Sequence, residues 1–393
     1  MAAHTGARVS RGWPYLVAAV AAGALLAAGC GFAEPALQPI TNLPLSRVVI
    51  PAVDGKTAQF DIMDVDQGAH RLFAADILLH GVDVVDTSTS PAHYLQTIPL
   101  DAPPAGLQFV AELKRLYVAA ADSTVTVIDA DPAAPHPYAV LAKVNTNGQG
   151  TADLMDYDAA DKKLYVTNPD VGFLSAIDVV KNTVVAQIQN LGALQQPRYD
   201  PVNGMVYVLN TDNNSIMQID PHRDALVRES VLPVVCQPHG LAINPATNQG
   251  LVGCGDKDNI VTLAWDFTAN HMIASFDLAG GGDAVVFDQK AQHFYFAAYG
   301  YTPAEVAVFN ASPITFLTAV PTSHRSRSVA YDELHNLVYT FDGKHFEGAL
   351  WAFPDPVTGC IGREAQRAAA GAPESQTPHC HPANASAPAK VGK

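Results

Sequence analysis

A short apolar element recurs seven times along the chain at almost constant spacing. Its central residue is aromatic in six copies, and the seven central positions are Phe73, Tyr117, Tyr165, Tyr207, Val252, Tyr295 and Tyr339. Successive copies lie 42 to 48 residues apart. Self-similarity at such a period is typical of architectures that repeat one supersecondary unit. The chain must therefore fold into seven equivalent units, and 28 Gly and 28 Pro favour turns over long helices.

Each repeat unit contains four short segments with the composition of strands. An Asp or Asn stands about seven residues before the central residue in six copies and closes an apolar segment, such as residues 240–243. Later segments include residues 125–129, 174–178 and 216–220, each ending in Asp. β-Branched and aromatic residues bounded by Gly, Pro, Asn and Asp are typical of strands and turns. Four strands in about 44 residues make one propeller blade. The predicted fold class is all-β, a seven-bladed β-propeller of four-stranded antiparallel blades.

The seventh unit supplies only three strands, the last of which runs to Asp355. Residues 46–51 (SRVVIP) form a strand without the three partners of a full unit. We expect this N-terminal strand to complete the last blade, because closure removes the edges that an open array would expose. The predicted divisions are a lipoprotein-type signal peptide at 1–29, a tether at 30–43, the propeller at 44–355 and a disordered Ala/Pro-rich tail at 356–393.

The N-terminus carries the features of an export signal. Arg8 and Arg11 precede an uncharged run over residues 13–29, and no acidic residue occurs before position 34. Residues 26–30 (LAAGC) resemble a bacterial lipobox, with Ala27 at the place where Leu is usual. This reading places lipid on Cys30 and anchors an exported protein to the outer membrane. The alternative is ordinary signal-peptidase cleavage after residues 31–33, which would release a soluble periplasmic protein.

Residues 165–168 read Tyr-Val-Thr-Asn. The chain therefore resembles the exported bacterial YVTN-repeat β-propeller family over roughly residues 44–355. The resemblance implies a seven-bladed propeller outside the cytoplasm, and some members are described as lactonase-like. It implies no single activity, so function has to be argued from particular sites.

The charge balance and the missing motifs exclude several function classes. Asp and Glu outnumber Lys and Arg 38 to 23, for a net charge of −15, which argues against binding nucleic-acid phosphates. The sequence contains no Gly-x-Ser-x-Gly elbow, Walker loop, His-Glu-x-x-His or Cys-x-x-Cys-His motif. We expect a monomer that meets the membrane only through its lipid anchor, with a small molecule or an envelope protein as its partner.

One residue position per blade is predicted to rim the central channel. It lies five residues before the Asp or Asn that closes the first strand, and the seven residues there are Asp61, Ala105, Asp153, Gln195, His239, Asp283 and Arg327. Antiparallel pairing places these positions at the face that also carries the loops between the second and third strands. Further charged residues near this rim are His324 and Arg325, and we count Arg198 and Arg325 among the ligand-binding residues of the channel mouth. Arg198, like Asp64 and Asp156, is a charge in a strand position that is otherwise buried.

Two functions fit such a ring of polar residues. The first is a binding or scaffold module that uses the channel mouth to hold a small anion, a sugar-like ligand or a protein partner. The alternative is a lactonase-type hydrolase, in which a channel metal held by Asp61, Asp153, Asp283 and His239 would activate water. We expect no cofactor for the first function, whereas a divalent cation is required for the second. Polar residues in a wet channel can also lack any function.

Weaker candidates are aromatic residues on the same face and a histidine pair in the tail. Residues 299–301 (YGY) and 344–346 (KHF) lie in loops between second and third strands and could stack on a ligand. Residues 379–381 (HCH) have the composition of a metal site but lie in the predicted disordered tail.

Four cysteines remain after Cys30 and suit an oxidising compartment. Cys236 precedes the first strand of blade five, and Cys254 ends the second strand of the same blade. Antiparallel pairing brings these two positions together, so we predict a Cys236–Cys254 disulfide, with two buried free thiols as the alternative. Cys360 and Cys380 would then pair with each other.

Overall fold

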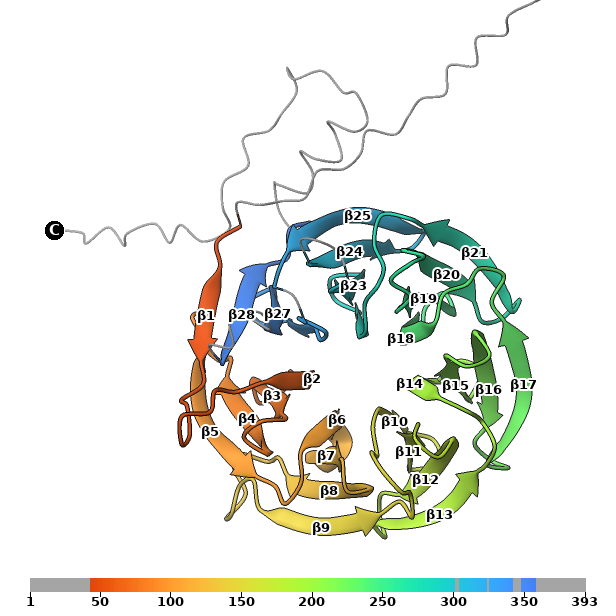
Figure 1. Cartoon of the computed structure of the whole chain (residues 1–393). Coiled ribbons are helices and arrows are strands. Elements are labelled where there is room, and N and C mark those ends of the chain that lie inside the picture. Colours follow the sequence, from red (N-terminus) through yellow and green to blue (C-terminus); the bar gives the residue numbers. More distant parts are fainter. Residues whose placement is uncertain (1–42, 301–303, 324, 342–347, 358–393) are drawn as a thin grey trace, which may run out of the picture. The chain divides into compact units, whose positions relative to one another are not determined.

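The computed structural model describes residues 43–300, 304–323, 325–341 and 348–357. It contains seven four-stranded antiparallel sheets, which are arranged as blades around a common centre (Figure 1). The predicted all-β, seven-bladed propeller is confirmed. Among the residues described, no helix is both long enough and apolar enough to span a membrane.

The first strand of each blade lies innermost and the fourth lies on the outside of the ring (Figure 1). The innermost strands are β2 (Phe60–Asp66), β6 (Pro104–Val110), β10 (Met155–Asp158), β14 (Leu194–Asp200), β18 (Pro238–Asn244), β22 (Val285–Asp288) and β26 (Ala330–Asp332). The second strands are β3 (Arg71–Asp76), β7 (Arg115–Ala120), β11 (Lys163–Asn168), β15 (Met205–Asn210), β19 (Gln249–Cys254), β23 (His293–Ala298) and β27 (Leu337–Phe341).

The third strands are β4 (Gly81–Asp86), β8 (Thr124–Asp129), β12 (Phe173–Asp178), β16 (Ser215–Asp220), β20 (Thr262–Asp266), β24 (Glu305–Ala311) and β28 (Ala349–Pro354). The outermost strands are β5 (His93–Pro99), β9 (Val140–Asn145), β13 (Thr183–Ile188), β17 (Ala225–Val231), β21 (His271–Phe276), β25 (Ile314–Pro321) and, in blade seven, β1 (Ser46–Val49). A single 3₁₀ turn, η1 (Ala111–Leu113), follows β6 within the described ranges.

An Asp or Asn ends six of the seven innermost strands, all but β6, and organises the turn that follows. Asp66 Oδ1 accepts hydrogen bonds from the backbone N–H groups of Gly68 and Ala69, and Asp158 Oδ1 does the same for Ala160 and Asp161. Such bonds from a side chain to the backbone N–H groups that follow it stabilise a tight turn. The residue therefore recurs because each blade needs this hairpin between its first two strands.

The aromatic residues of the second strands are buried between neighbouring blades. Tyr165 is fully buried, and its hydroxyl donates a hydrogen bond of 2.7 Å to Asp224 in the next blade. In blade five the register differs by one residue from the repeat count. Ala242 pairs with Leu251, as Asp64 pairs with Phe73 in blade one, so Leu251 and not Val252 takes the aromatic's place.

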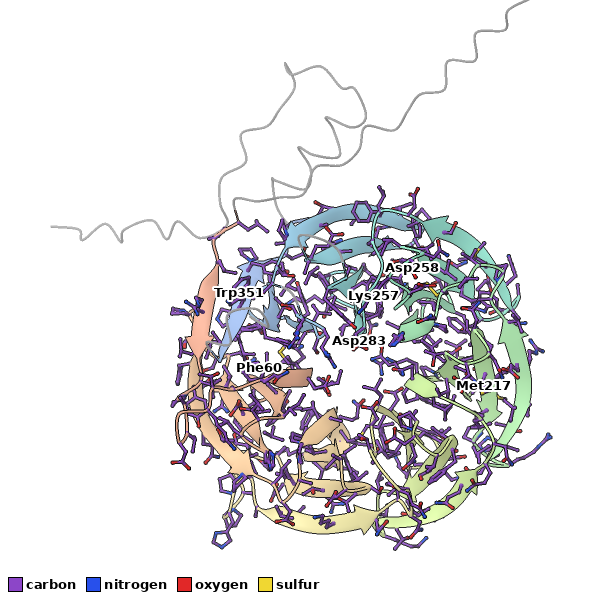
Figure 2. All side chains as sticks on the ribbon, in the orientation of Figure 1. Phe60, Met217, Lys257, Asp258, Asp283 and Trp351 are labelled. Atoms are coloured by element: carbon purple, nitrogen blue, oxygen red, sulfur yellow. A yellow bond between two sulfur atoms is a disulfide. The ribbon has the colours of Figure 1, made fainter. Side chains whose placement is uncertain are left out.

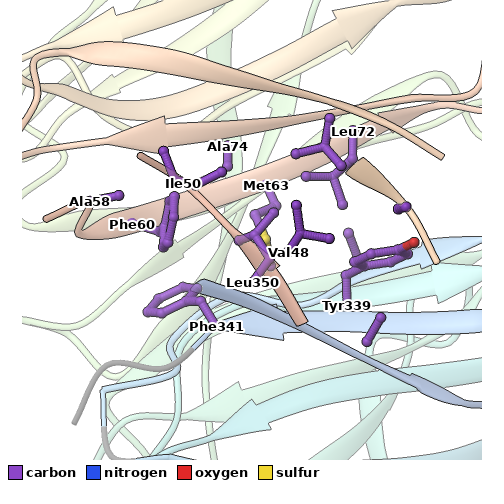
Figure 3. Packing of buried hydrophobic residues seen from close by; sticks show 14 of the residues in the cluster. Val48, Ile50, Ala58, Phe60, Met63, Leu72, Ala74, Tyr339, Phe341 and Leu350 are labelled. Carbon is purple, nitrogen blue, oxygen red and sulfur yellow. The ribbon is translucent and has the colours of Figure 1, made fainter. Parts of the chain in front are cut away.

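The ring closes through β1, as predicted. β1 pairs antiparallel with β28 from Ser46↔Ala352 to Val49↔Ala349, and Ile50 adds a 2.7 Å bond to the carbonyl of Gly348. The regular strand ends at Val49, two residues before the expected end at residue 51. Val48 packs into a buried cluster with residues of the first and last blades (Figure 3). Four residues thus join the two ends of the repeat array.

Candidate functional site

The seven predicted ring residues occupy one structural position, at an irregularity near the start of each innermost strand. In β2, β6, β14 and β18 the pairing register shifts at Asp61, Ala105, Gln195 and His239, and Asp153, Asp283 and Arg327 stand just before β10, β22 and β26. A bulge of this kind changes the direction of a side chain at the end of a strand. Asp283 lies on the inner rim of the ring (Figure 2). We call these seven residues, together with Tyr299, the channel mouth.

Two glycines allow neighbouring innermost strands to meet at the channel mouth. A Cβ atom on Gly106 would lie 2.2 Å from the carbonyl oxygen of Asp153, and one on Gly240 would lie 2.0 Å from that of Asp283. Only glycine tolerates such a close approach of two backbones. The backbones that carry Asp153 and Asp283 are therefore held firmly against the preceding blade.

Three carboxylates and one guanidinium determine the electrostatics of the channel mouth. Burial, and then repulsion from Asp153, raise the pKa of Asp61 to about 8, although Arg327 lowers it. Burial and repulsion from Asp283 raise the pKa of Asp153 to about 7. Burial also raises the pKa of Asp283, against the effect of His239 and Arg327. These side chains are crowded by protein yet still reach solvent, since that of Asp61 is 18% exposed.

Arg327 is held among these acids. Its Nη1 lies 4.0 Å from Asp61 Oδ1, and its guanidinium carbon lies 5.9 Å from the centre of the Tyr299 ring. Burial lowers the pKa of Arg327, but the carboxylates of Asp61 and Asp283 outweigh that effect and leave it raised. One permanent cation therefore faces three carboxyl groups, and the channel mouth becomes short of positive charge as these groups ionise in alkaline solution.

His239 lies at the irregularity near the start of β18 and is held there by a contact with the residue two positions before it. Its Nδ1 lies 2.7 Å from the carbonyl oxygen of Gln237, which can only accept, so Nδ1 carries a proton. A Cβ on Gly255 would lie 2.2 Å from that nitrogen, so this glycine makes room for the ring. Just before β18, Cys236 forms a disulfide with Cys254 at the end of β19; their Cα atoms are 4.8 Å apart, and this predicted pairing is confirmed.

Removing that disulfide is expected to destabilise the protein substantially. The bridge links residues 18 positions apart, and closing a loop of this length contributes about 3 kcal/mol. We expect the double variant Cys236→Ala/Cys254→Ala to unfold at lower urea concentration than the wild type under non-reducing conditions. Wild-type protein in reductant serves as the control. An unchanged urea midpoint in the double variant would show that the bridge contributes nothing.

A second layer of polar residues lies deeper in the channel and has a structural role. Asp64 Oδ2 accepts a 2.7 Å bond from the N–H of Phe109, and Asp156 Oδ2 accepts a 2.6 Å bond from the N–H of Tyr199. In both cases the carboxylate satisfies a backbone donor on the innermost strand of the next blade. Such donors have no sheet partner, and leaving them unpaired is costly.

The second layer also contains Arg198, Gln196 and Ser328, which the sequence did not assign to it. Arg198 belongs here and not at the mouth, with its Nη1 3.7 Å from Asp156 Oδ1. Gln196 and Ser328 accept backbone bonds from Leu241 and Met63. These two residues do not recur in the other repeats, because each accepts a hydrogen bond from one particular backbone N–H of a neighbouring blade.

Arg325 is exposed beside the mouth, with a left-handed φ of 66°, and its carbonyl oxygen accepts a 2.8 Å bond from the N–H of Arg327. Other predicted residues lie outside the described ranges. They are Cys30, Tyr301, His324, Cys360, Cys380 and residues 344–346 and 379–381.

The channel contains two cavities that share several lining residues. One of about 160 Å³ lies at the second layer and is lined by residues of six blades, in or just before their innermost strands. The other, of about 310 Å³, lies at the end remote from the channel mouth and is lined partly by turns between first and second strands. We call the second one the far-end cavity.

The predicted metal ligands Asp61, Asp153, Asp283 and His239 do not form a metal site in the described part of the chain. No three His, Cys, Asp or Glu side chains there are grouped closely enough to hold an ion. Asp61, Asp153 and Asp283 influence one another electrostatically but stand too far apart to share one. The metal-dependent hydrolase therefore gains no support from the geometry.

Comparisons with known proteins bear on the fold. The sequence matches no protein-family model and no curated protein. A chain of the "Crystal Structure of Mitotic Checkpoint Complex" is similar, with a TM-score of 0.64 and 12% identity over 88% of this chain and 99% of that chain. A chain of the Kuenenia stuttgartiensis hydrazine synthase is similar, with a TM-score of 0.64 and 13% identity over 78% of this chain and all of that chain. Identities this low show a shared fold alone, so membership of the YVTN-repeat family stays a prediction.

Proposed function

We propose that this protein is a binding protein of the cell envelope that takes a small ligand with two protonated amines at its channel mouth. The observation that carries the proposal is the imbalance of charge at that site. Three carboxyl groups from blades one, three and six face one guanidinium. An ammonium group between them would relieve the repulsion that raises their pKa values.

The spacing of the carboxylates supports an organic cation over a metal ion. Asp61, Asp153 and Asp283 are too far apart to act as ligands of one metal, yet close enough to raise one another's pKa values. A chain with an ammonium group at each end can reach two of them at once. His239 and Tyr299 offer a hydrogen-bonding ring and an aromatic face beside this site, and an aromatic face attracts cations.

The cellular location belongs to the same proposal and rests on the sequence. The basic start, the uncharged run and the lipobox-like residues 26–30 support export and lipid attachment at Cys30. A propeller held at the membrane by such an anchor would present its channel mouth to the periplasm or the cell surface. Scaffold and binding roles are common for this fold, which itself supplies no chemistry.

Titration calorimetry with putrescine (1,4-diaminobutane) tests the proposal on the full chain. At pH 8.5, where Asp61 and Asp153 are largely ionised, we expect binding of putrescine and none of its neutral isostere 1,4-butanediol. Asp153→Asn and Asp283→Asn should each weaken binding roughly tenfold, as expected for the loss of one charge-assisted hydrogen bond. Arg327→Gln should strengthen it, because it removes the competing cation.

Asp101 provides a matched control for these substitutions. It lies in the loop between β5 and β6 on the same face, its side chain is 85% exposed, and it pairs with Lys143. Asp101→Asn removes one negative charge from this face without touching the channel, so putrescine affinity should not change. Equal losses in Asp101→Asn and Asp283→Asn would mean that only net charge attracts the diamine, and the proposed site would be abandoned.

A further inference from the structure

The far-end cavity opens on the face opposite to the channel mouth. Its lining comes from the innermost strands and the following turns of blades one, five, six and seven, and its volume is about 310 Å³. Small-molecule pockets typically begin at about 300 Å³. The cavity is therefore large enough for a compact ligand and shares none of the residues of the channel mouth.

The walls of the channel differ in polarity from one side to the other. At the second-layer position, two residues before the end of each innermost strand, blades one to four carry Asp64, Gln108, Asp156 and Arg198. Blades five to seven carry Ala242, Val286 and Ala330 at the same position. The far-end cavity lies mainly against the second group, so its lining combines apolar side chains, such as Met63, Val286 and Phe287, with the polar ones of Gln67 and Gln289 and with three acids.

The charged residues that line this cavity are all acids. Asp64 lies within the cavity, and Asp288 and Glu333 contribute from the turns of blades six and seven. Burial and then the nearby Glu333 carboxylate act to raise the pKa of Asp288, whereas its bonds to Ala291 and Lys290 oppose them. The ammonium of Lys290 donates to the backbone oxygen of Glu333 at 2.6 Å, so it lies at the rim.

We infer that the far-end cavity is a second binding site, for a small amine with an apolar body. The apolar body would pack against the side chains of Met63, Val286 and Phe287, which line one part of the cavity. The ammonium group would lie toward Asp64 and Glu333, whose carboxylates supply the complementary charge. A concave pocket that offers both apolar side chains and a few convergent polar groups is a common form of small-molecule site. This inference is independent of the function proposed for the channel mouth.

Methyl NMR of the full chain labelled at the methionine methyl groups offers a direct test with phenethylamine as the probe. The chain has six Met, of which Met63 lines the far-end cavity, while Met217 is buried within blade four, away from the centre (Figure 2). We expect phenethylamine to shift the Met63 signal and leave the Met217 signal unchanged. The neutral isostere 2-phenylethanol should bind at least about tenfold more weakly, because it forms no ion pair.

Two variants separate the site from its surroundings. Val286→Phe fills the cavity and should abolish the Met63 shift, whereas Val202→Phe, at an exposed turn residue on the same face, should not. Glu333→Gln, which keeps the shape and removes one charge, should weaken phenethylamine but not 2-phenylethanol. Thermal unfolding confirms that each variant is folded.

The inference is overturned if phenethylamine leaves the Met63 signal in place in the wild type, or if the alcohol binds as tightly as the amine. The two proposals can fail independently of each other, because Asp283 does not line the far-end cavity and Asp283→Asn should leave the response to phenethylamine unchanged. Conversely, loss of putrescine binding in that variant says nothing about the far-end cavity.

Discussion

Val48→Asp is expected to lower the free energy of unfolding by about 3–5 kcal/mol, because it places an unpaired charge in the core that closes the ring. Val48 is 4% exposed and packs in one cluster with Ile50, Phe60 and Leu350 (Figure 3). It lies on β1, which alone among the described outer strands pairs with a blade from the other end of the chain. Urea unfolding followed by circular dichroism gives the midpoint and the cooperativity.

Val49→Asp is the matched control for that change. Val49 is the next residue of the same strand, pairs with Ala349, and is 58% exposed. An aspartate there faces solvent, so we expect a change within about 0.5 kcal/mol. If both variants lost the same stability, or neither did, β1 would not act as the strand that closes the ring.

Asp83→Asn is expected to make the protein more stable than the wild type in alkaline solution, by on the order of 3 kcal/mol at pH 8.5. Asp83 and Asp76 are both fully buried on adjacent strands of blade one. Asp83 accepts a hydrogen bond from Thr97, and its carboxyl group also interacts with that of Asp76. Burial is the main cause that raises the pKa of Asp83 to about 8. At the equivalent positions, blade three has the uncharged residues Asn168 and Ser175, and the Asn168 amide donates a hydrogen bond to the Ser175 hydroxyl.

The direction of this effect follows from the two pKa values. An unfolded Asp ionises near 3.8, whereas folded Asp83 holds its proton to about pH 8. Stability from this group is complete below pH 3.8 and is lost as the pH rises through 8. The amide cannot ionise, so the advantage of Asp83→Asn should grow between pH 5 and pH 8.5 in urea titrations.

Asp86→Asn, on the same strand, should behave in the opposite way. Burial acts to raise the pKa of Asp86, but bonds to Ser88 and the charge of Arg71 outweigh it, so this pKa is lowered. The amide loses these interactions, and the variant should be less stable than the wild type at neutral pH. A difference between Asp83→Asn and wild type that stays constant with pH would show that Asp83 is already ionised in the folded protein.

The fold could be predicted because the repeat and its turns are local properties of the sequence. The Asp or Asn that ends six of the seven innermost strands forms a turn with its own neighbours, as Asp66 does with Gly68 and Ala69, so it stands at the same place in those six copies. The Cys236–Cys254 pair followed from antiparallel pairing alone. In blade five the sequence placed the central residue at Val252, whereas the structure has Leu251 at that position. Neither residue is aromatic, so nothing in the sequence distinguished the two.

The candidate site could be predicted only in part, for a physical reason. The ring positions could be found by counting, because the irregularity that turns them toward the channel recurs in each blade. The role of Asp64 and Asp156 depends on backbone donors of the next blade, which lie more than 40 residues away. The far-end cavity combines residues from both ends of the chain, such as Met63 and Tyr331, and their relative positions appear only once the ring is closed.

The most direct test of the account is the pH dependence of putrescine binding to the full chain. Asp153 and Asp61 have pKa values of about 7 and about 8, so both are largely protonated at pH 6 and largely ionised at pH 8.5. Alkylamines stay protonated over this range, since their pKa is about 10.4. The affinity for putrescine should therefore rise about tenfold or more from pH 6 to pH 8.5, and Asp61→Asn/Asp153→Asn should remove that rise. An affinity that is unchanged or falls with rising pH would contradict binding of a cation by these carboxylates.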